Sequence, residues 1–299
     1  MTDLTLSNDE LEEIEAGFRQ ALTSKSFDGL NVLGFGELGV AFGFPTGEPR
    51  LVVKRVASHA DPAIVQHGFD RITRYEALLA PHLRVTDSAH VTTTASNGWL
   101  APYIVQPLYP KHTIGDSVLA DCEPDPEHPM VLALRDAAVA VAEAGETVLD
   151  SQFSNVVWDD DGLLFFDTGS PFFVDADGEP LVDLGPAESA IPAPMRPIAK
   201  KLSVKVQKDL SDPSGNLAHA ALSAVRVGQE RWLDALLVAF NDSLDQPLER
   251  TDVMEQFARI QKDMTNIKYL ARAQRFWMTK VRRGSYDFFI TDSFNGKLI

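Results

Sequence analysis

DSQFSNVVWDDDGLLFFDTG, residues 150–169, places three side chains that can bind protons or metal ions around one short hairpin. Asp150 and Asn155 lie five residues apart in a polar loop, ahead of an apolar strand. Asp167 follows the apolar run 163–166 and precedes a glycine, so it should leave the core at a strand end. Carboxylate and amide oxygens suit Mg²⁺. We therefore expect Asp150 to orient or deprotonate an attacking hydroxyl, and Asn155 and Asp167 to hold a metal ion.

The turn of this hairpin is Asp159-Asp160-Asp161-Gly162. Three adjacent carboxylates could suggest a second metal site. However, the glycine that follows them is typical of a tight hairpin turn. We interpret the three aspartates as a solvated turn.

A glycine-rich segment, GFGELG at residues 34–39, lies between two predicted strands. Residues 40–44 continue as a strand, whereas a dinucleotide-binding GxGxxG would open a helix. Because they lack Cβ atoms, Gly34, Gly36 and Gly39 would let backbone N–H groups approach phosphate oxygens. Taken alone, the motif fits an ordinary glycine-rich hairpin slightly better.

Lys54 interrupts the apolar strand predicted over 51–56, at the distance from the glycine segment that one returning strand imposes. A buried ammonium is costly unless it is paired. Glu76, in the helix predicted over 61–83, is the best partner, although a surface position for it is equally plausible and Asp70 is a weaker rival. An ion pair would hold the ammonium where it can meet ATP phosphates.

The remaining pattern divides the chain into a sheet-rich part and a helical part, with a change of composition at the connector 106–110. We predict an α+β fold with two lobes. The N-terminal lobe, 1–106, has a leading helix, the glycine loop and a five-stranded antiparallel sheet with one long helix; the mostly helical lobe, 107–299, carries the catalytic hairpin. Further predicted helices and strands cover 7–22, 30–33, 90–95, 99–105, 130–144, 172–174, 181–182, 231–240 and 254–281.

In this order and spacing, the segments resemble the protein-kinase-like superfamily, which includes small-molecule kinases similar to aminoglycoside phosphotransferases. The resemblance covers roughly residues 28–175 and implies a bilobal kinase-like fold that uses ATP and Mg²⁺. It implies that Asp150 is the catalytic aspartate and that Asn155 and Asp167 are the metal ligands. The nucleotide-binding residues that it implies are Gly34, Gly36, Gly39, Lys54, Glu76, Gln106 and Leu108.

The chain departs from the family pattern at several positions. Val148 stands where a histidine usually precedes the catalytic aspartate, and Thr168 replaces the phenylalanine of Asp-Phe-Gly. No Ala-Pro-Glu follows Asp167, so a peptide-binding platform is not evident. Only about 40 residues separate the connector from Asp150, which leaves little room for the inserted substrate helices of aminoglycoside phosphotransferases.

The composition indicates a globular protein and disfavours nucleic acid as a partner. Of the 299 residues, 44% are hydrophobic, and the formal net charge is −16. Nucleic acid phosphates need clustered Lys and Arg. Cys122 is the single cysteine, which fits a reducing compartment. No signal-peptide pattern opens the chain, and no apolar stretch approaches the roughly 20 residues that span a bilayer, so we expect a cytoplasmic protein without a membrane partner.

Charge is unevenly distributed along the chain. Residues 1–249 hold 17 Lys and Arg against 38 Asp and Glu, whereas 250–283 hold nine against three. This basic segment could recognise an anionic partner. We favour the interpretation that it is the solvated face of amphipathic helices docked on an acidic body.

These observations predict an ATP- and Mg²⁺-dependent phosphotransferase that acts on a hydroxyl group of a small molecule. The acidic body would suit a cationic acceptor such as an amino sugar. Two alternatives remain: an atypical protein Ser/Thr kinase, and a nucleotide-binding pseudokinase or scaffold without transfer activity. Val148 favours the pseudokinase, whereas retention of Lys54, Asp150, Asn155 and Asp167 together argues against it.

Overall fold

A computed structural model of the chain describes residues 2–24, 26–27, 29–35, 39–185 and 196–259. Three predictions fall wholly or partly outside these ranges: Gly36, the part of the helix predicted over 254–281 that follows residue 259, and the part of the basic segment 250–283 that follows the same residue. Within the described residues, no helix combines the length and the apolar character needed to cross a membrane.

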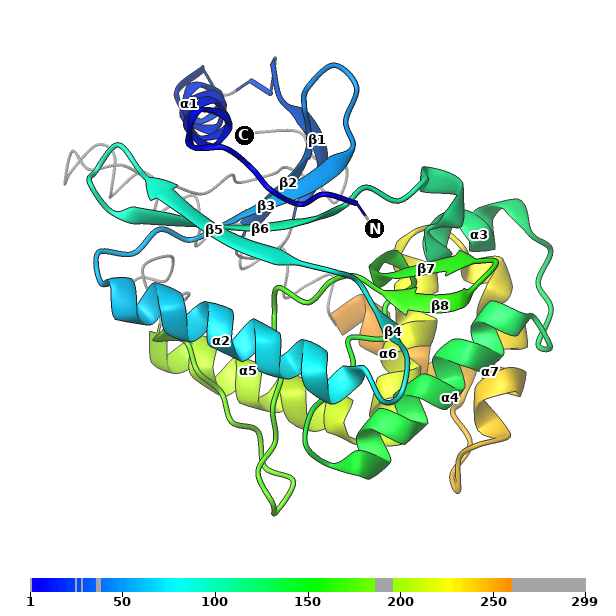
Figure 1. The fold of residues 1–299 in the computed structure, drawn as a ribbon. Coiled ribbons are helices and arrows are strands. Elements are labelled where there is room, and N and C mark those ends of the chain that lie inside the picture. The colour runs from blue at the N-terminus through cyan, green and yellow to red at the C-terminus, as the bar shows by residue number, and fades with distance from the viewer. Residues whose placement is uncertain (1, 25, 28, 36–38, 186–195, 260–299) are drawn as a thin grey trace.

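The first part of the described chain forms an antiparallel sheet of five strands in the order β1-β2-β3-β6-β5 (Figure 1). Gly39 pairs with Val56, and this register runs without a break to Phe44 opposite Leu51. β1 and β2, which flank the glycine segment, pair antiparallel with Phe35 opposite Val40. The prediction that two strands flank this segment is therefore confirmed. The strands are β1 (Asn31–Phe35), β2 (Gly39–Phe44), β3 (Leu51–Val56), β5 (Ala89–Thr94) and β6 (Leu100–Pro107).

Helix α1 (Asn8–Ser24) covers one face of this sheet (Figure 1). It begins with the predicted capping box, in which the backbone N–H of Ser7 donates to Glu10 and the N–H of Glu10 to the Ser7 hydroxyl. Its apolar stripe buries Phe18 against strand residues such as Val53. The first lobe therefore has its own hydrophobic core on this side.

Helix α2 (Pro62–Leu79) lies against the opposite face, where Phe69 and Ile72 pack on Ile104. Successive side chains of a strand point to opposite faces. Lys54 pairs in register with Ile104, so its side chain is directed to the α2 side. The alternation of β3 thus decides on which face the ammonium lies.

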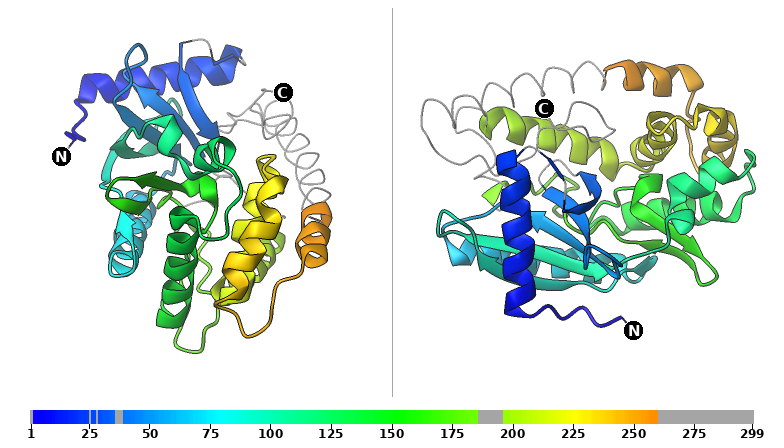
Figure 2. Two further views of the ribbon diagram at one scale, coloured as in Figure 1. Left: turned by 90° about the vertical axis from the view of Figure 1, so that its right-hand side faces the viewer. Right: turned by 90° about the horizontal axis from the view of Figure 1, so that it is seen from above.

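The second part is helical and contains a three-stranded sheet in the order β4-β8-β7, counted within the described residues. In Figure 2, α4 runs beside α6 and α7, and Leu134, Leu217 and Leu236 are buried in the core they share. The strands are β4 (Arg84–Val85), β7 (Val156–Asp159) and β8 (Gly162–Phe165), and the α-helices are α3 (Gly115–Asp121), α4 (Pro129–Ala144), α5 (Arg196–Ser211), α6 (Pro213–Arg226) and α7 (Leu233–Asn241). Short 3-10 helices cover Lys111–Thr113, Phe153–Asn155 and Glu230–Trp232.

The architecture confirms the predicted α+β, bilobal, protein-kinase-like fold: an antiparallel sheet with one long helix, followed by a mostly helical part that carries a hairpin. The boundary between residues 106 and 107 stays a prediction.

Arg250, at the start of a helix over 250–259, pairs with Glu230 and Asp234, which agrees with docking on an acidic body at this position.

Some boundaries differ from the predictions. The helix predicted over 61–83 ends at Leu79, because Pro81 has no backbone N–H to donate to a preceding carbonyl. The two strands predicted over 172–174 and 181–182, on either side of a turn at 175–178, form a single isolated bridge between Val174 and Pro180, while Phe173 bridges to Thr147 outside this hairpin. Neither α3 nor β4 was predicted, because both are too short to show a clear periodicity.

Candidate active site

Lys54 and Asp167, 113 residues apart in the sequence, meet at the site. The Nζ of Lys54 donates to Asp167 Oδ1 at 2.9 Å and to the Phe166 carbonyl oxygen at 3.1 Å. The side chain of Lys54 is 15% exposed and that of Asp167 38% exposed. The burial of the ammonium is thus compensated by a carboxylate that stays accessible from solvent.

The predicted ion pair between Lys54 and Glu76 is not found among the described residues. Glu76 Oε1 instead accepts hydrogen bonds from the hydroxyls of Ser88 at 2.7 Å and Thr168 at 2.8 Å. Glu76 lies in the last turn of α2, beyond the residues that pack on Ile104, so it reaches the start of β5 and Thr168. The Glu76 carboxylate therefore holds the segment that follows Asp167 and does not pair with Lys54.

Gln106 and Leu108 occupy the end of β6 and the start of the connector. The buried side chain of Gln106 donates from Nε2 to Thr168 Oγ1 at 3.4 Å, which adds a third residue to the Glu76–Thr168 pair. The backbone N–H of Leu108 donates to the Arg50 carbonyl at 3.1 Å and thereby extends the pairing of β3 with β6. This N–H is therefore already in use, and a nucleotide contact by Leu108 would have to involve its carbonyl or side chain.

The two described glycines of the loop serve different purposes. A Cβ on Gly39 would come within 2.5 Å of the Arg55 carbonyl oxygen, so the pairing of β2 with β3 itself requires glycine there. A Cβ on Gly34 would meet no heavy atom of the described chain within 4 Å. Gly34 follows an irregularity in the register of β1 and β2 at Val32. The absence of a side chain at Gly34 is therefore not explained by packing of the described residues.

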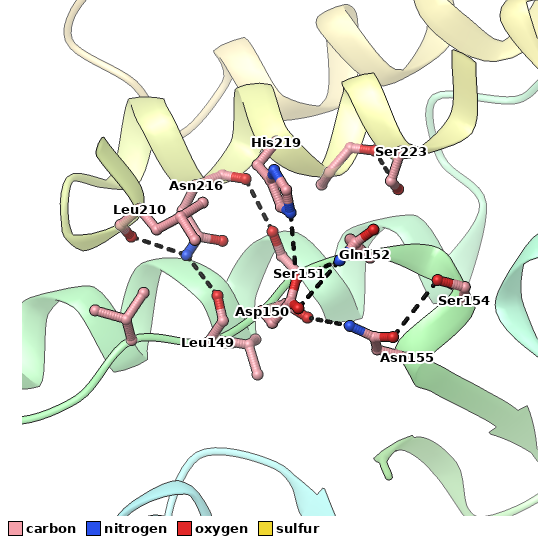
Figure 3. Close-up of polar contacts among 12 residues, drawn as sticks. Leu149, Asp150, Ser151, Gln152, Ser154, Asn155, Leu210, Asn216, His219 and Ser223 are labelled. Atoms are coloured by element: carbon pink, nitrogen blue, oxygen red, sulfur yellow. Dashed lines mark hydrogen bonds and ion pairs between the residues drawn. The ribbon is translucent and has the colours of Figure 1, made fainter. Parts of the chain in front are cut away.

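Asp150 lies in the loop after α4, where two side-chain nitrogen donors make three contacts with its carboxylate (Figure 3). The side-chain amide of Gln152 donates to both carboxylate oxygens at 3.0 Å, and His219 Nε2 lies 3.2 Å from Oδ1. Because an ionised carboxylate only accepts, Nε2 carries the proton of the ring. Burial raises the pKa of the Asp150 carboxyl, but the hydrogen bonds from His219 and Gln152 outweigh it and leave that pKa below its usual value. Asp150 is thus ionised at neutral pH.

Asn155 is held in the same loop. Its Nδ2 donates to the backbone carbonyl of Asp150 at 3.4 Å, and its side chain is nearly buried (Figure 3). The backbone carbonyl of Asn155 accepts from the N–H of Phe166 at 3.0 Å. The loop is therefore connected directly to the residue before Asp167, which brings both predicted metal ligands into one structural unit.

Helix α6 anchors this loop from outside through one of its faces. Asn216 donates to the Leu149 carbonyl at 2.8 Å and its own carbonyl accepts from Ser151 Oγ (Figure 3). The hydroxyl of Ser223 accepts from the Phe153 N–H. The residues of α6 that contact the loop are Asn216, His219, Ser223 and Arg226, the last through Gln152 Oε1. Spacings of three, four and three residues place them on one side of the helix.

Val148, where the pattern of the resemblance has a histidine, is a packing residue. It is 1% exposed and clusters with Val174 and Leu210. Its carbonyl accepts from the Tyr75 hydroxyl at 2.8 Å. The backbone next to Asp150 is thus supported by an apolar contact and a buried tyrosine, which explains how the fold does without an imidazole at this position.

Sequence analysis missed His219, Gln152 and Thr168. The signal for His219 was present: polar residues recur at helical spacing in 216–226, a segment otherwise rich in alanine and leucine. Gln152 lies two residues from Asp150, so its position indicated a side chain near the carboxylate. The direction of its amide, however, depends on the contact with Arg226, which the sequence does not show. No sequence pattern predicts the contact between Thr168 and Glu76.

The donor atoms fit Mg²⁺. Within the described residues there is no group of three His, Cys, Asp or Glu side chains that could hold a metal ion. Asn155 and Asp167 would supply two oxygen ligands, and Mg²⁺ commonly uses one or two protein carboxylates, substrate phosphates and water for the rest. A site of this kind is completed by a nucleotide.

Comparison with known proteins identifies structural similarity only. No family model matches the chain, and no curated protein matches it. The chain is similar to crystal structures of the Mycobacterium tuberculosis PknI kinase domain. A point mutant of that domain has a TM-score of 0.35 and 17% identity, over 77% of this chain and 83% of that one. Another structure of the domain has a TM-score of 0.34 and 17% identity, over 74% and 80%.

Proposed function

We propose that the protein is an ATP- and Mg²⁺-dependent phosphotransferase that acts on a hydroxyl group of a small molecule. The observation that carries this proposal is the 2.9 Å contact between Lys54 and Asp167, residues from the sheet and from the end of the hairpin segment. A partly buried ammonium beside an accessible carboxylate provides one group for phosphates and one for a metal ion. The proposal extends to the subclass that includes aminoglycoside phosphotransferases.

Each side chain would have a distinct role. Lys54 would bind ATP phosphates, and Asn155 and Asp167 would hold Mg²⁺, which neutralises phosphate charge when bound. Asp150, ionised and held by Gln152 and His219, would accept a hydrogen bond from the attacking hydroxyl and orient it. The open space at Gly34 would let the hairpin approach the nucleotide.

The acceptor that we propose is cationic, such as an amino sugar. The formal net charge of −16 favours attraction of a cation to the acidic body. Absence of an Ala-Pro-Glu sequence after Asp167 favours a small acceptor over a peptide. We also propose that the reaction takes place in the cytoplasm, in accord with the single cysteine.

A pseudokinase is the second candidate, and one structural observation favours it. Glu76, the expected partner of Lys54, is instead bound to Thr168 and Ser88. A protein that no longer transfers phosphate could keep such an arrangement. An atypical protein Ser/Thr kinase remains the alternative within the same chemistry.

Nucleotide-dependent thermal stabilisation tests the shared part of these proposals. A ligand that binds the native state alone raises the melting temperature. We expect ATP with Mg²⁺ to stabilise the wild type and Asp160→Ala, a change in the exposed hairpin turn, but to have little effect on Asp167→Ala. Equal stabilisation of all three proteins would refute the proposed metal site.

Phosphate transfer then separates the three candidates. We would incubate the protein with [γ-³²P]ATP, Mg²⁺ and kanamycin, glucosamine, choline or myelin basic protein. Label in a small molecule supports the proposal, and label in protein alone supports a protein kinase. Mg²⁺-dependent ATP binding without any transfer supports the pseudokinase. Asp150→Asn should retain ATP binding and lose transfer.

A further inference from the structure

The His219 imidazole differs in its contacts from the other residues on the inner face of α6. Asn216 bonds to backbone groups at Leu149 and Leu210, and Ser223 to the backbone of Phe153. His219 instead reaches the side chain of Asp150, at 3.2 Å from Oδ1 (Figure 3). The contacts of Asn216 and Ser223 fix the backbone of the loop, whereas the His219 contact acts on the Asp150 carboxylate itself.

The donors are unequally shared between the two oxygens of Asp150. Oδ1 accepts from both His219 and Gln152, while Oδ2 accepts from Gln152 alone among the described residues. Each carboxylate oxygen has about two lone-pair positions. With two side-chain donors, Oδ1 is the more fully occupied oxygen, and Oδ2, with one, is the oxygen more open to a further donor.

Partial burial makes this arrangement stable. The side chains of His219 and Asp150 are 16% and 19% exposed. A carboxylate with so little access to water is costly unless donors compensate for the lost hydration. Gln152 is itself oriented, because its Oε1 accepts from Arg226 Nη1 at 3.2 Å. Two donors from different parts of the chain thus restrict the rotation of the Asp150 carboxylate.

We propose that His219 is a positioning residue, which fixes the Asp150 carboxylate so that Oδ2 faces the acceptor hydroxyl. This inference rests on the proposed phosphotransferase activity. It names Oδ2 of Asp150 as the oxygen that meets the acceptor hydroxyl, and His219 of α6 as the residue that fixes its direction. A hydroxyl that meets a fixed acceptor atom reacts more readily than one that meets a rotating carboxylate, because less orientational freedom is lost in the transition state.

Two substitutions at His219 test the role of its N–H. His219→Leu removes the donor at similar volume, and His219→Gln keeps an N–H at similar reach. With the acceptors named above and [γ-³²P]ATP, we expect His219→Leu to lower kcat by about 10- to 100-fold. The KM for ATP should change by less than about twofold, because among the described residues the hydrogen bond of His219 goes to Asp150 and not to a proposed nucleotide-binding residue. His219→Gln should recover kcat to within about threefold of the wild type.

His128→Leu is the matched control. His128 is another partly exposed histidine with a hydrogen bond, from the Met130 N–H to its Nδ1, but it caps α4. We expect this change to lower stability and leave kcat unaffected. Wild-type kcat in His219→Leu, or equal losses in His219→Leu and His219→Gln, would overturn the inference while the phosphotransferase assignment stands.

A spectroscopic measurement does not depend on turnover. Long-range ¹H–¹⁵N correlation spectra should show the His219 ring protonated at Nε2, with a proton shift that changes in Asp150→Ala. An unchanged ring signal in Asp150→Ala would overturn the inference. Absence of phosphate transfer in the wild type, with the ring contact present, would instead refute the proposed function, and with it the role of His219.

Discussion

The hydroxyl of Thr168 donates a 2.8 Å hydrogen bond to the Glu76 carboxylate. Thr168 is fully buried and follows Asp167 directly, so this contact connects α2 to the backbone of the predicted metal ligand. The side-chain amide of Gln106 completes the group on the other side of the hydroxyl. The Thr168 hydroxyl therefore connects α2, β6 and the segment after Asp167 through hydrogen bonds, whereas an apolar side chain would connect them only by packing.

We predict that Thr168→Val weakens both the fold and Mg²⁺-dependent nucleotide binding. Valine has nearly the shape of threonine but cannot donate to Glu76, and a hydrogen bond to a charged group is worth about 1.5–3 kcal/mol. Urea denaturation should show a loss of this size in the free energy of unfolding. The rise in melting temperature with ATP and Mg²⁺ should shrink, because Asp167 is less well positioned.

Thr168→Ser is the control, since serine keeps the hydroxyl and loses one methyl group. It should retain most of the nucleotide-dependent stabilisation. If serine and valine behave alike, the hydroxyl is not what positions Asp167.

The strands were largely predictable because their signals are local. Alternating apolar residues flank turns rich in glycine and proline around β2, β3, β5 and β6, and these features together predict an antiparallel sheet. The hairpin after Asn155 was visible for the same reason. By contrast, α3 has seven residues and β4 two, so neither produces a periodic pattern.

The partners within the site were less predictable than the residues themselves. The sequence analysis singled out Lys54 and Asp167, which the structure brings together, but assigned Lys54 to Glu76. Choosing between two carboxylates requires the position of Glu76 along α2 relative to Ser88 and Thr168, which depends on tertiary packing. His219 was missed for a related reason: its partner lies 69 residues away.

Val148 provides a test of whether an imidazole could be restored next to the Asp150 loop. Its side chain is buried with Val174 and Leu210, with no space for a polar ring. We predict that Val148→His lowers the free energy of unfolding by about 1–3 kcal/mol, through overpacking and an uncompensated polar group. Activity should not rise.

Val238→His is the matched control, because Val238 on α7 is 58% exposed. The same change there should alter stability by less than about 0.5 kcal/mol in urea denaturation. A stable and more active Val148→His protein would show that the site accepts a histidine after all.

Glu15 and Arg55 form a buried ion pair between α1 and β3. Arg55 Nε and Nη2 donate to the two carboxylate oxygens at 2.8 and 3.2 Å, and both side chains are at most 2% exposed. The Tyr103 hydroxyl also donates to Glu15. Arg19 Nε also lies 3.5 Å from Glu15 Oε1, but its side chain is 42% exposed. Because breaking a buried, hydrogen-bonded ion pair at either end is strongly destabilising, Glu15→Gln and Arg55→Met should each cost about 3–5 kcal/mol.

The double variant Glu15→Gln/Arg55→Met should lose less than the sum of the two single changes, because each single change already breaks the Glu15–Arg55 pair and glutamine still accepts from Tyr103. Urea denaturation of all four proteins provides this comparison. Additive losses would mean that the two side chains contribute independently.

His90 should make the stability of the protein depend on pH near neutrality. Its ring stacks on Phe69 with centroids 4.8 Å apart, and burial lowers its pKa from the ordinary value of 6.5, with Glu76 and Asp70 acting in the opposite direction. Above pH 6.5 the ring is neutral in both states and the stability does not depend on it. As the pH falls below 6.5, the unfolded chain binds a proton before the native protein does, so the free energy of unfolding falls until the native ring also becomes protonated.

His90→Phe keeps the stacking and removes the titration. Urea denaturation between pH 7.5 and 5 should therefore show a smaller loss of stability in the variant than in the wild type, with a remaining slope to which His128 contributes, because burial lowers its pKa too. Parallel curves for the two proteins would mean that His90 takes up its proton equally well in the native and unfolded states.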